Sequence, residues 1–492
     1  MGRDVMIINL NQNQNRYRLA VAGFVTFAFL VYFAWAFIQP FNSASDEYMR
    51  YQISQFIYQK GFLPLGSDPE IINPIWGTSY GFTPILAYII GAAFMKITSL
   101  FTADSFALLM SARLVSVFCN TGTVIVCFKI ADKLFSGLYR WMFVIFVAFL
   151  PQFIFIGSYV NTDAMAIFST ALIVYAWIHG LTSHWSRLSC ILLAAGISVC
   201  ALSYYNAYGF ILCSILLYLA DHLITYKAVL RPKYKFVKAA VDQHECQDSK
   251  RGVKQSGKPT ISGTQQFWSQ TGRQAGLIIA FVFILAGWWF IRNAIIYQGD
   301  FLGLRTSDHY AQINALEAFK PSHIDSAYNN HWNIWYLLFD KQWLVISYKS
   351  LIGCFGYMEI WLKPAIYYGY TILWGIGGIG LFSWIINGLL RHTLNLDFKK
   401  NLLPFVLLLT IPIPFLLSLY YSYYSDFQPQ GRYLLPMLIP LMIFITKGLQ
   451  LIIDKMFVNI WIRRCIQILI CLLIAAAAGY CYFYILIPRY FP

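Results

Sequence analysis

The chain has 492 residues, of which 59% are hydrophobic and only 12% are charged. A soluble protein of this size could not cover so much apolar surface, whereas repeated apolar runs of about 20 residues are typical of a polytopic α-helical membrane protein. The net charge of +15 would suggest a nucleic-acid partner in a soluble protein. Here the basic residues cluster between apolar runs, as they do in cytoplasmic loops, so no nucleic-acid partner is expected.

The apolar runs predict an all-α fold of about eleven transmembrane helices in a single domain, residues 1–492. The predicted spans are 19–38, 107–130, 141–158, 162–182, 187–203, 206–225, 274–296, 367–389, 402–422, 433–452 and 464–487. The N-terminus is then expected in the cytoplasm and the C-terminus outside. Residues 84–100 are expected to form a re-entrant or interfacial helix, because another crossing there would place Lys129 and Lys133 outside.

Two large extracytoplasmic loops are predicted, at 39–106 and 297–366, each with short interfacial helices. A basic cytoplasmic loop is predicted at 226–273, because the stretch 226–274 carries ten Lys and Arg against three acids. The stretch 299–366 carries five Lys and Arg against six acids. This asymmetry follows the positive-inside pattern and predicts a multi-pass protein of the plasma (inner) membrane.

Two adjacent carboxylates, Asp46 and Glu47, follow the first predicted span after a break at Pro40. Carboxylates beside a membrane core cost free energy unless they are paired or solvated, so their presence indicates a functional site. The alternative is that Asp46 caps a surface helix, with Glu47 in its first turn. Both interpretations fit this dipeptide.

Other polar residues are predicted at the same outer membrane surface. Asn161 and Asp163 lie between two spans, where either could instead cap the following helix. Arg292 ends another span after Trp288 and Trp289, a pattern that a snorkelling cation in an aromatic belt would also explain. The convergence of several segments at one depth favours a site over any single motif.

Arg432 and Tyr433 open the tenth predicted span at that surface. Positive-inside statistics disfavour Arg at an outer boundary, although surface snorkelling could still place one there. An Arg in this position favours an anionic ligand, and a lipid-linked phosphate suits it because the guanidinium group grips phosphate oxygens with two hydrogen bonds.

Motifs for soluble cofactors are missing from the sequence. There is no Gly-rich nucleotide-phosphate loop ending in Gly-Lys-Ser/Thr and no His-Glu-x-x-His zinc motif. The eight His are dispersed, without metal-ligand spacing on one helix. We therefore expect no metal ligands and no obligatory cofactor, and a divalent metal is left open as the alternative.

Several short stretches, in order along most of the chain, resemble the GT-C superfamily of membrane glycosyltransferases. The nearest branch comprises protein O-mannosyltransferases, lipid A aminoarabinose transferases and related bacterial membrane proteins. The matching stretches are Ser45-Asp46-Glu47, Ala112-Arg113-Leu114-Val115-Ser116, Ala131-Asp132-Lys133-Leu134-Phe135, Leu150-Pro151-Gln152-Phe153, Asn161-Thr162-Asp163-Ala164, Gly287-Trp288-Trp289, Arg292-Asn293, Tyr297-Gln298-Gly299-Asp300, Phe355-Gly356-Tyr357-Met358 and Pro429-Gln430-Gly431-Arg432-Tyr433-Leu434.

The resemblance implies that the acidic residue of the first outer loop is the catalytic centre. Asp46 would be the general base or would orient the acceptor, with Glu47 as its neighbour. Arg432 and Arg292 would hold the donor phosphate and stabilise its developing charge. The remaining candidates for acceptor or substrate binding are Arg50, which stands where the family often has His, together with Asn161, Asp163 and Tyr433.

The sequence thus predicts an inverting glycosyltransferase. It would move a sugar from a polyprenyl-phosphate donor to a glycan, lipid or protein acceptor on the extracytoplasmic face, with membrane lipids as its other partners. A transporter or flippase of lipid-linked saccharides is the main alternative, and a polysaccharide polymerase or ligase of another fold is a third. A transporter would need a polar path through the helix bundle, and few charges lie inside the predicted spans.

Overall fold

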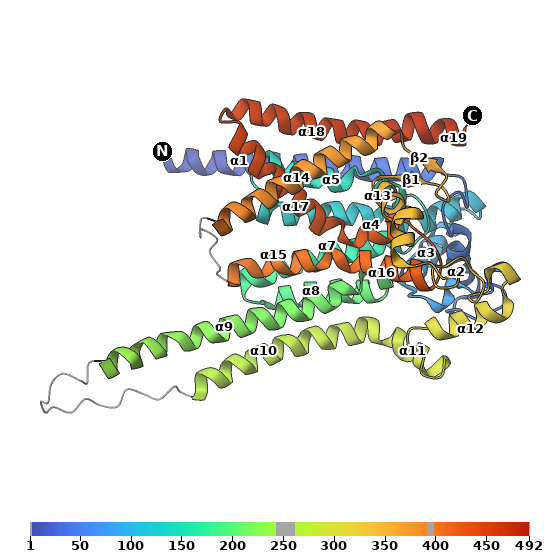
Figure 1. Cartoon of the computed structure of the whole chain (residues 1–492), viewed down its shortest axis with the longest axis horizontal. Helices are drawn as coiled ribbons and strands as arrows, with labels where there is room; N and C mark the ends of the chain where they lie inside the picture. Colours follow the sequence, from blue (N-terminus) through green and yellow to red (C-terminus); the bar gives the residue numbers. More distant parts are fainter. Residues whose placement is uncertain (1, 243–260, 391–397, 492) are drawn as a thin grey trace, which may run out of the picture.

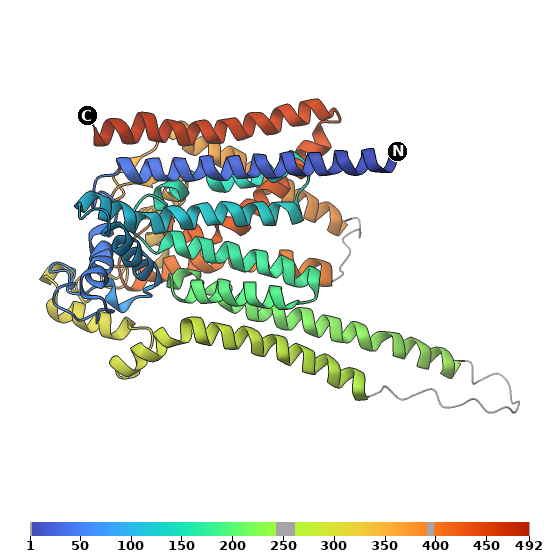
Figure 2. The same ribbon diagram turned by 180° about the vertical axis from the view of Figure 1, so that it is seen from behind.

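The computed structural model describes residues 2–242, 261–390 and 398–491. The fold is a bundle of roughly parallel helices, and Figures 1 and 2 show the N-terminus and the C-terminus at opposite ends of it. Within the described residues, nine helices are long and apolar enough to cross a membrane. This confirms the prediction of an all-α, multi-pass membrane protein.

The bounds of the helices along the bundle are as follows. They are α1 (Gly2–Ile38), α4 (Ser105–Leu134), α5 (Leu138–Ala148), α6 (Pro151–Ile156), α7 (Asp163–Ser183), α8 (Arg187–Ala201), α9 (Gly209–Asp242), α10 (Ile261–Val282), α11 (Trp288–Ile296), α14 (Pro364–Leu390), α15 (Phe398–Thr410), α16 (Pro412–Tyr424), α17 (Leu438–Met456), α18 (Ile460–Tyr480) and α19 (Ile487–Tyr490).

The predicted count of eleven crossings is not confirmed, because two of the predicted spans contain only shorter helices. The span at 141–158 is divided into α5 and α6, with Pro151 at the start of α6. Proline has no backbone N–H to continue a helix, so the chain breaks there. The span at 187–203 contains α8, which has 15 residues. A helix of that length spans about 22 Å, less than the roughly 30 Å of a bilayer core.

Short elements gather at one end of the bundle, which we call the Asp46 end (Figure 1). The first predicted outer loop contains α2 (Glu47–Lys60), a 3₁₀ turn at Tyr80–Phe82 and α3 (Leu86–Thr98). The second contains α12 (Leu304–Asn314), α13 (Trp343–Ile352) and a hairpin of β1 (Cys354–Phe355) with β2 (Ile360–Trp361). Both loops therefore contain short helices, as predicted.

The predicted basic loop at 226–273 is largely helical where the structure describes it. Helix α9 continues to Asp242, and α10 begins at Ile261. The remaining part of that prediction, residues 243–260, lies outside the described residues. Lys and Ala occur repeatedly between 226 and 242, and both residues favour helix, so α9 continues beyond its apolar segment.

Helices α4 and α7 form the centre of the bundle, with most of their apolar segments buried. Helices α10, α14 and α18 lie outside and leave most of their apolar surface uncovered by protein, as lipid-facing helices do. Helices α14 and α17 approach closely through glycines. A Cβ added at Gly448 would lie 1.7 Å from the carbonyl oxygen of Gly377, so only small residues permit this contact.

Candidate active site

Asp46 stands at the junction between the end of α1 and the start of α2. Its backbone is in the left-handed region, with φ 65° and ψ 9°, and its side chain forms no capping hydrogen bond with α2. A helix-capping residue normally has extended dihedral angles and accepts a hydrogen bond from the first turn. The capping interpretation of this side chain is therefore wrong, and the carboxylate is directed elsewhere.

The Asp46 carboxylate lies between two arginines from different parts of the chain. Its Oδ2 atom accepts a hydrogen bond from Nη2 of Arg432 at 2.9 Å and lies 3.9 Å from Nη2 of Arg50. Burial alone would raise the Asp46 pKa, but the charges of Arg432 and Arg50 outweigh it and lower the pKa from 3.8. The lowered pKa keeps the carboxylate ionised, and the side chain is still accessible because 27% of its surface is exposed.

Arg432 is held in place by a close contact between backbones. It lies in a 3₁₀ turn, Gly431–Met437, that leads into α17. A Cβ at Gly431 would lie 2.0 Å from the backbone nitrogen of Leu351 in α13, so glycine is required at this position. The Gly431 N–H also donates to the hydroxyl of Ser350. These contacts fix the start of the turn that carries Arg432.

The Arg432 guanidinium keeps unused hydrogen-bond donors although it is buried. Its Nη2 atom donates hydrogen bonds to Asp46 and to the Tyr433 hydroxyl, whereas Nε and Nη1 have no hydrogen-bond partner among the described residues. A buried donor without a partner costs about 1–3 kcal/mol, so such groups normally face water or a ligand. A cavity of about 10 Å³, enough for one water molecule, lies beside Arg432 between Ser45, Gly356 and Gln430.

Arg50 extends the charged network to α7. Its Nη1 atom donates to the hydroxyl of Thr162 at 3.0 Å and lies 3.6 Å from the carboxylate of Asp163. Arg432, Asp46, Arg50 and Asp163 thus form a row of alternating charges from three segments: the turn before α17, the start of α2 and the start of α7. The two positive and two negative charges compensate one another, which lowers the free-energy cost of burying them.

Glu47 faces away from this row. Its carboxylate accepts hydrogen bonds from Nε and Nη2 of Arg113 and from the backbone N–H groups of Asn42 and Val160. Arg113 also donates to the carbonyl oxygens of Ala36 and Gln39, at the end of α1. Neither charged side chain is exposed, so Glu47 has no free face for a substrate. We assign Glu47 a positioning role, in which it joins the end of α1 to α4.

Two other predicted site residues use their polar atoms locally. Asn161 donates to the carbonyl oxygens of Ile156 and Tyr159 and accepts from the N–H of Ala164, so it caps α7 as the alternative interpretation held. Arg292 donates to the carbonyl oxygen of Pro64 at 2.7 Å and lies over the ring of Trp289. No ion pair joins Arg292 to an acid among the described residues.

Tyr433 connects the charged row to residues that the sequence analysis missed. Its hydroxyl donates to Gln428, and the amide of Gln428 donates to Asp426. Asp426 lies outside the membrane-spanning segments, and burial raises its pKa to about 6. Arg113 was the other omission, and a charge inside the apolar run of α4 was the signal that could have found it.

The acidic residues of the charged row face arginines. Within the described residues, no three His, Cys, Asp or Glu side chains gather closely enough to hold a metal ion. Asp46 and Asp163 both face Arg50 instead. The arrangement can hold one more anion at the free donors of Arg432 and present the Asp46 carboxylate beside it.

No protein-family model matches the sequence, and no curated protein matches it. Among solved structures, the chain is similar to ArnT from Cupriavidus metallidurans bound to undecaprenyl phosphate, with 12% identity and a TM-score of 0.47 over 91% of this chain. It is also similar to the oligosaccharyltransferase AglB from Archaeoglobus fulgidus in complex with an inhibitory peptide and a dolichol-phosphate, with 13% identity and a TM-score of 0.48 over 97% of this chain.

The chain spans 62% of the ArnT structure and 56% of the AglB structure. Both neighbours are GT-C membrane glycosyltransferases, the superfamily that the sequence motifs resemble. At these identities and TM-scores the likeness carries no argument about the reaction.

Proposed function

We propose that this protein transfers a sugar from a polyprenyl-phosphate donor to a hydroxyl of a glycan, lipid or protein acceptor, with inversion at the sugar carbon. Its site would lie on the extracytoplasmic face of the plasma (inner) membrane, as the distribution of basic residues suggests. The observation that carries the proposal is the pairing of Asp46 with an arginine that keeps two unused donors.

The phosphate of the donor fits the free side of Arg432. Phosphate oxygens accept hydrogen bonds from a guanidinium group in pairs, and such charge-assisted bonds are stronger than neutral ones. Nε and Nη1 of Arg432 supply two donors next to the cavity. The site lies beside α2 and α13 at the Asp46 end of the bundle (Figure 1), so a lipid tail could remain in the bilayer while the phosphate reaches Arg432.

The reaction follows from the positions of the two charged groups. An acceptor oxygen attacks the sugar carbon, the bond from that carbon to the phosphate oxygen breaks, and the proton of the acceptor passes to Asp46. Arg432 stabilises the charge that develops on the departing polyprenyl phosphate. A carboxylate with a lowered pKa is a weak base. Phosphate binding would draw Arg432 away from Asp46 and raise the pKa of Asp46 when the base is needed.

A donor requires more room than the cavity now provides. The hairpin of β1 and β2 closes it on one side, through Gly356 and Met358. The tip of this hairpin is bound to the turn before α2, because the Tyr357 hydroxyl donates to Asn42 at 2.7 Å. We propose that the donor enters when this contact opens.

Arg292 is not part of the proposed phosphate site, because its guanidinium donates to the carbonyl oxygen of Pro64 and lies over the ring of Trp289. The transporter alternative receives little support from α4, whose charged residues lie towards its two ends. Between Arg113 and Lys129 the helix has no charged residue. The polar side chains at that depth, Ser116, Asn120, Thr121 and Thr123, each donate to a backbone carbonyl oxygen and offer no charge to a lipid headgroup.

A direct assay can separate the two functions. Purified protein in lipid vesicles is given a panel of polyprenyl-phosphate sugars and candidate acceptors, and the release of free polyprenyl phosphate is measured. We expect donor turnover that depends on the acceptor. Movement of intact donor across the vesicle membrane without turnover would contradict the proposal and favour the transporter.

A further inference from the structure

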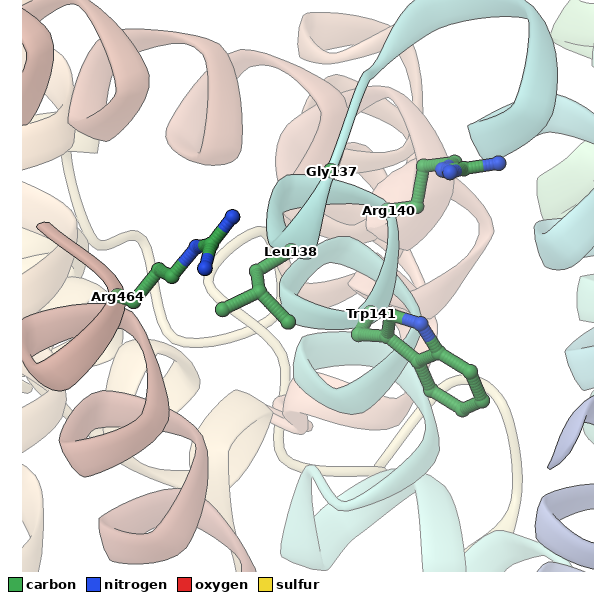
Figure 3. A pocket seen from close by; sticks show the side chains of 5 residues that line it. All are labelled: Gly137, Leu138, Arg140, Trp141 and Arg464. Atoms are coloured by element: carbon green, nitrogen blue, oxygen red, sulfur yellow. The ribbon is translucent and has the colours of Figure 1, made fainter. Parts of the chain in front are cut away.

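A second cavity lies at the end of the bundle opposite Asp46, between the starts of α5 and α18. Its volume is about 400 Å³, and it is lined by Gly137, Leu138, Arg140, Trp141 and Arg464. Figure 3 shows Arg464 reaching from α18 towards Leu138 at the start of α5, with Arg140 and Trp141 in the same turn as Leu138. Nothing in the proposed transfer reaction uses this cavity.

Arg464 brings an uncompensated charge to the cavity. Its guanidinium lies over the ring of Trp461, and no acidic side chain pairs with it among the described residues. The adjacent Arg463 differs, because it forms an ion pair with Asp454 at 3.3 Å and donates to the carbonyl oxygen of Phe457. The chain thus places one engaged and one free arginine side by side in the first turns of α18.

The α5 side of the cavity also favours an anion. Arg140 pairs with Asp132 at 3.2 Å, and its Nε atom is buried without a partner. Helix α5 starts after Gly137, which has no side chain to cap the free N–H groups of the first turn. Those N–H groups add positive potential to that of Arg464. Arg140 is engaged elsewhere, because it pairs with Asp132, lies over the Tyr17 ring and points away from Arg464 (Figure 3).

The depth of Arg464 and the exposed apolar side chains near the cavity suit a lipid better than a soluble ligand. Arg464 lies four residues after the start of α18, or about 6 Å along the helix axis, a depth that suits the headgroup region. Beyond it on the same side of α18, Ile468 and Leu472 are exposed. A charged group at the cavity and an apolar chain along α18 would cover both surfaces.

We propose that this cavity binds the phosphate headgroup of an anionic phospholipid, with an acyl chain lying along α18. The shared chemistry of an anion with the Arg464 guanidinium and the first N–H groups of α5 also fits free phosphate, but only a lipid would use the exposed apolar side chains of α18. The distribution of basic residues predicts this end on the cytoplasmic side, where anionic lipids attract such residues. The site is independent of the proposed transferase function.

The test compares two neutralised neighbours, Arg464→Gln and Arg463→Gln, which have the same net charge. Each protein is purified in a neutral detergent and mixed with phosphatidylglycerol or phosphatidylcholine, and bound lipids are counted by native mass spectrometry. We expect wild-type protein and Arg463→Gln to retain one more phosphatidylglycerol than Arg464→Gln does. Phosphatidylcholine retention should be equal in all three. Thermal unfolding in detergent shows that each variant is folded.

Equal retention of phosphatidylglycerol by Arg464→Gln and Arg463→Gln would overturn the proposal. Inorganic phosphate and glycerol phosphate at millimolar concentration form a separate arm. If they displace the retained lipid completely, the cavity is a site for a free anion and the lipid assignment is wrong. If the lipid stays bound, the acyl chain contributes as proposed. An Arg464→Lys variant should recover part of the retention, because the charge remains while the paired donors are lost.

Discussion

The carboxylate of Glu47 accepts two hydrogen bonds from the guanidinium of Arg113, at 2.7 Å from Nε and 2.8 Å from Nη2, and neither side chain is exposed. This pair connects the turn before α2 to α4. The adjacent Asp46 points to Arg432 instead. The two neighbouring acids therefore have different partners: Glu47 pairs with Arg113 of α4, and Asp46 pairs with Arg432, which lines the cavity.

The pairing predicts a strong effect of Glu47→Gln on stability. Removing one partner leaves the Arg113 charge buried without a counter-ion, and such losses cost about 3–5 kcal/mol. The free energy of unfolding in detergent, measured with a denaturant, should fall by about that amount. A Glu47→Gln protein that is as stable as wild type but inactive would assign Glu47 to the chemistry instead.

The sequence predicted the location of the site better than the tasks of its residues. The break at Pro40 and the disfavoured outer arginine drew attention to Asp46 and Arg432, which the structure brings together. The positive φ of Asp46, which turns the two carboxylates apart, depends on tertiary contacts and has no sequence signal. Both Glu47 and Arg113 were visible as charges beside apolar runs, but the pairing between residues 66 positions apart was not.

The fold was predictable from the sequence where the length of an apolar run determines whether a helix can cross the membrane. Apolar runs identified most of the long helices. The same runs overestimated helix length in two places, the α5–α6 segment and α8, because local breaks in the chain end these helices early. The polar ends of α9 and α10 were read as loop, because hydropathy detects a bilayer and not a helix. Asn161 fits a cap as well as a site on sequence grounds, and its hydrogen bonds favour the cap.

Arg50 provides a test of the charge on Asp46. Arg50 is one of the two cations that lower the pKa of Asp46, so Arg50→Gln should raise that pKa. A carboxylate that acts as base loses activity as the pH falls through its pKa. The acid limb of kcat/KM for sugar transfer should therefore move to higher pH in Arg50→Gln. An unshifted acid limb would exclude Asp46 as the group that this limb reports.

Asp426 predicts that the stability of the folded protein falls as the pH rises. Burial raises its pKa to about 6, and the charges of Asp325 and Asp46 contribute to the rise. The folded protein thus binds the Asp426 proton more tightly than the unfolded chain does. Stability from this group is present below its ordinary pKa of 3.8 and is lost as the pH rises through 6.

Asp426→Asn should remove that loss. One pKa unit corresponds to about 1.4 kcal/mol, and partial exposure reduces the effect, so we expect the variant to gain about 1–2 kcal/mol over wild type at pH 7. The gain should vanish near pH 4. Thermal unfolding of both proteins between pH 4 and pH 7 measures the difference. A constant offset across this range would mean that Asp426 does not titrate there.

Arg432→Ala should weaken donor binding, because the proposed phosphate loses its main partner. A hydrogen bond to a charged group is worth about 1.5–3 kcal/mol, which corresponds to about a ten- to hundredfold weaker affinity. Arg432→Lys should fall between Ala and wild type, since the charge remains without the fork. Arg489→Ala, an exposed arginine at the same end, is the matched control. Binding of a labelled polyprenyl-phosphate sugar gives the affinities, and an unchanged value for Arg432→Ala removes this residue from the site.

The most direct test of the account is sugar transfer by Asp46→Asn. Asparagine keeps the shape of the side chain and can accept a hydrogen bond from Arg432, but it cannot take the proton of the acceptor. Positioned general bases contribute about 10²–10⁴-fold, so turnover should fall by that factor while donor affinity stays near wild type. The buried Arg432 and Arg50 lose a counter-ion, so thermal stability should fall, and turnover is measured below the unfolding transition of the variant. Glu70→Gln, at an exposed pair with Lys60, should transfer normally. Near wild-type turnover by Asp46→Asn would contradict the catalytic role of Asp46 and the transferase proposal with it.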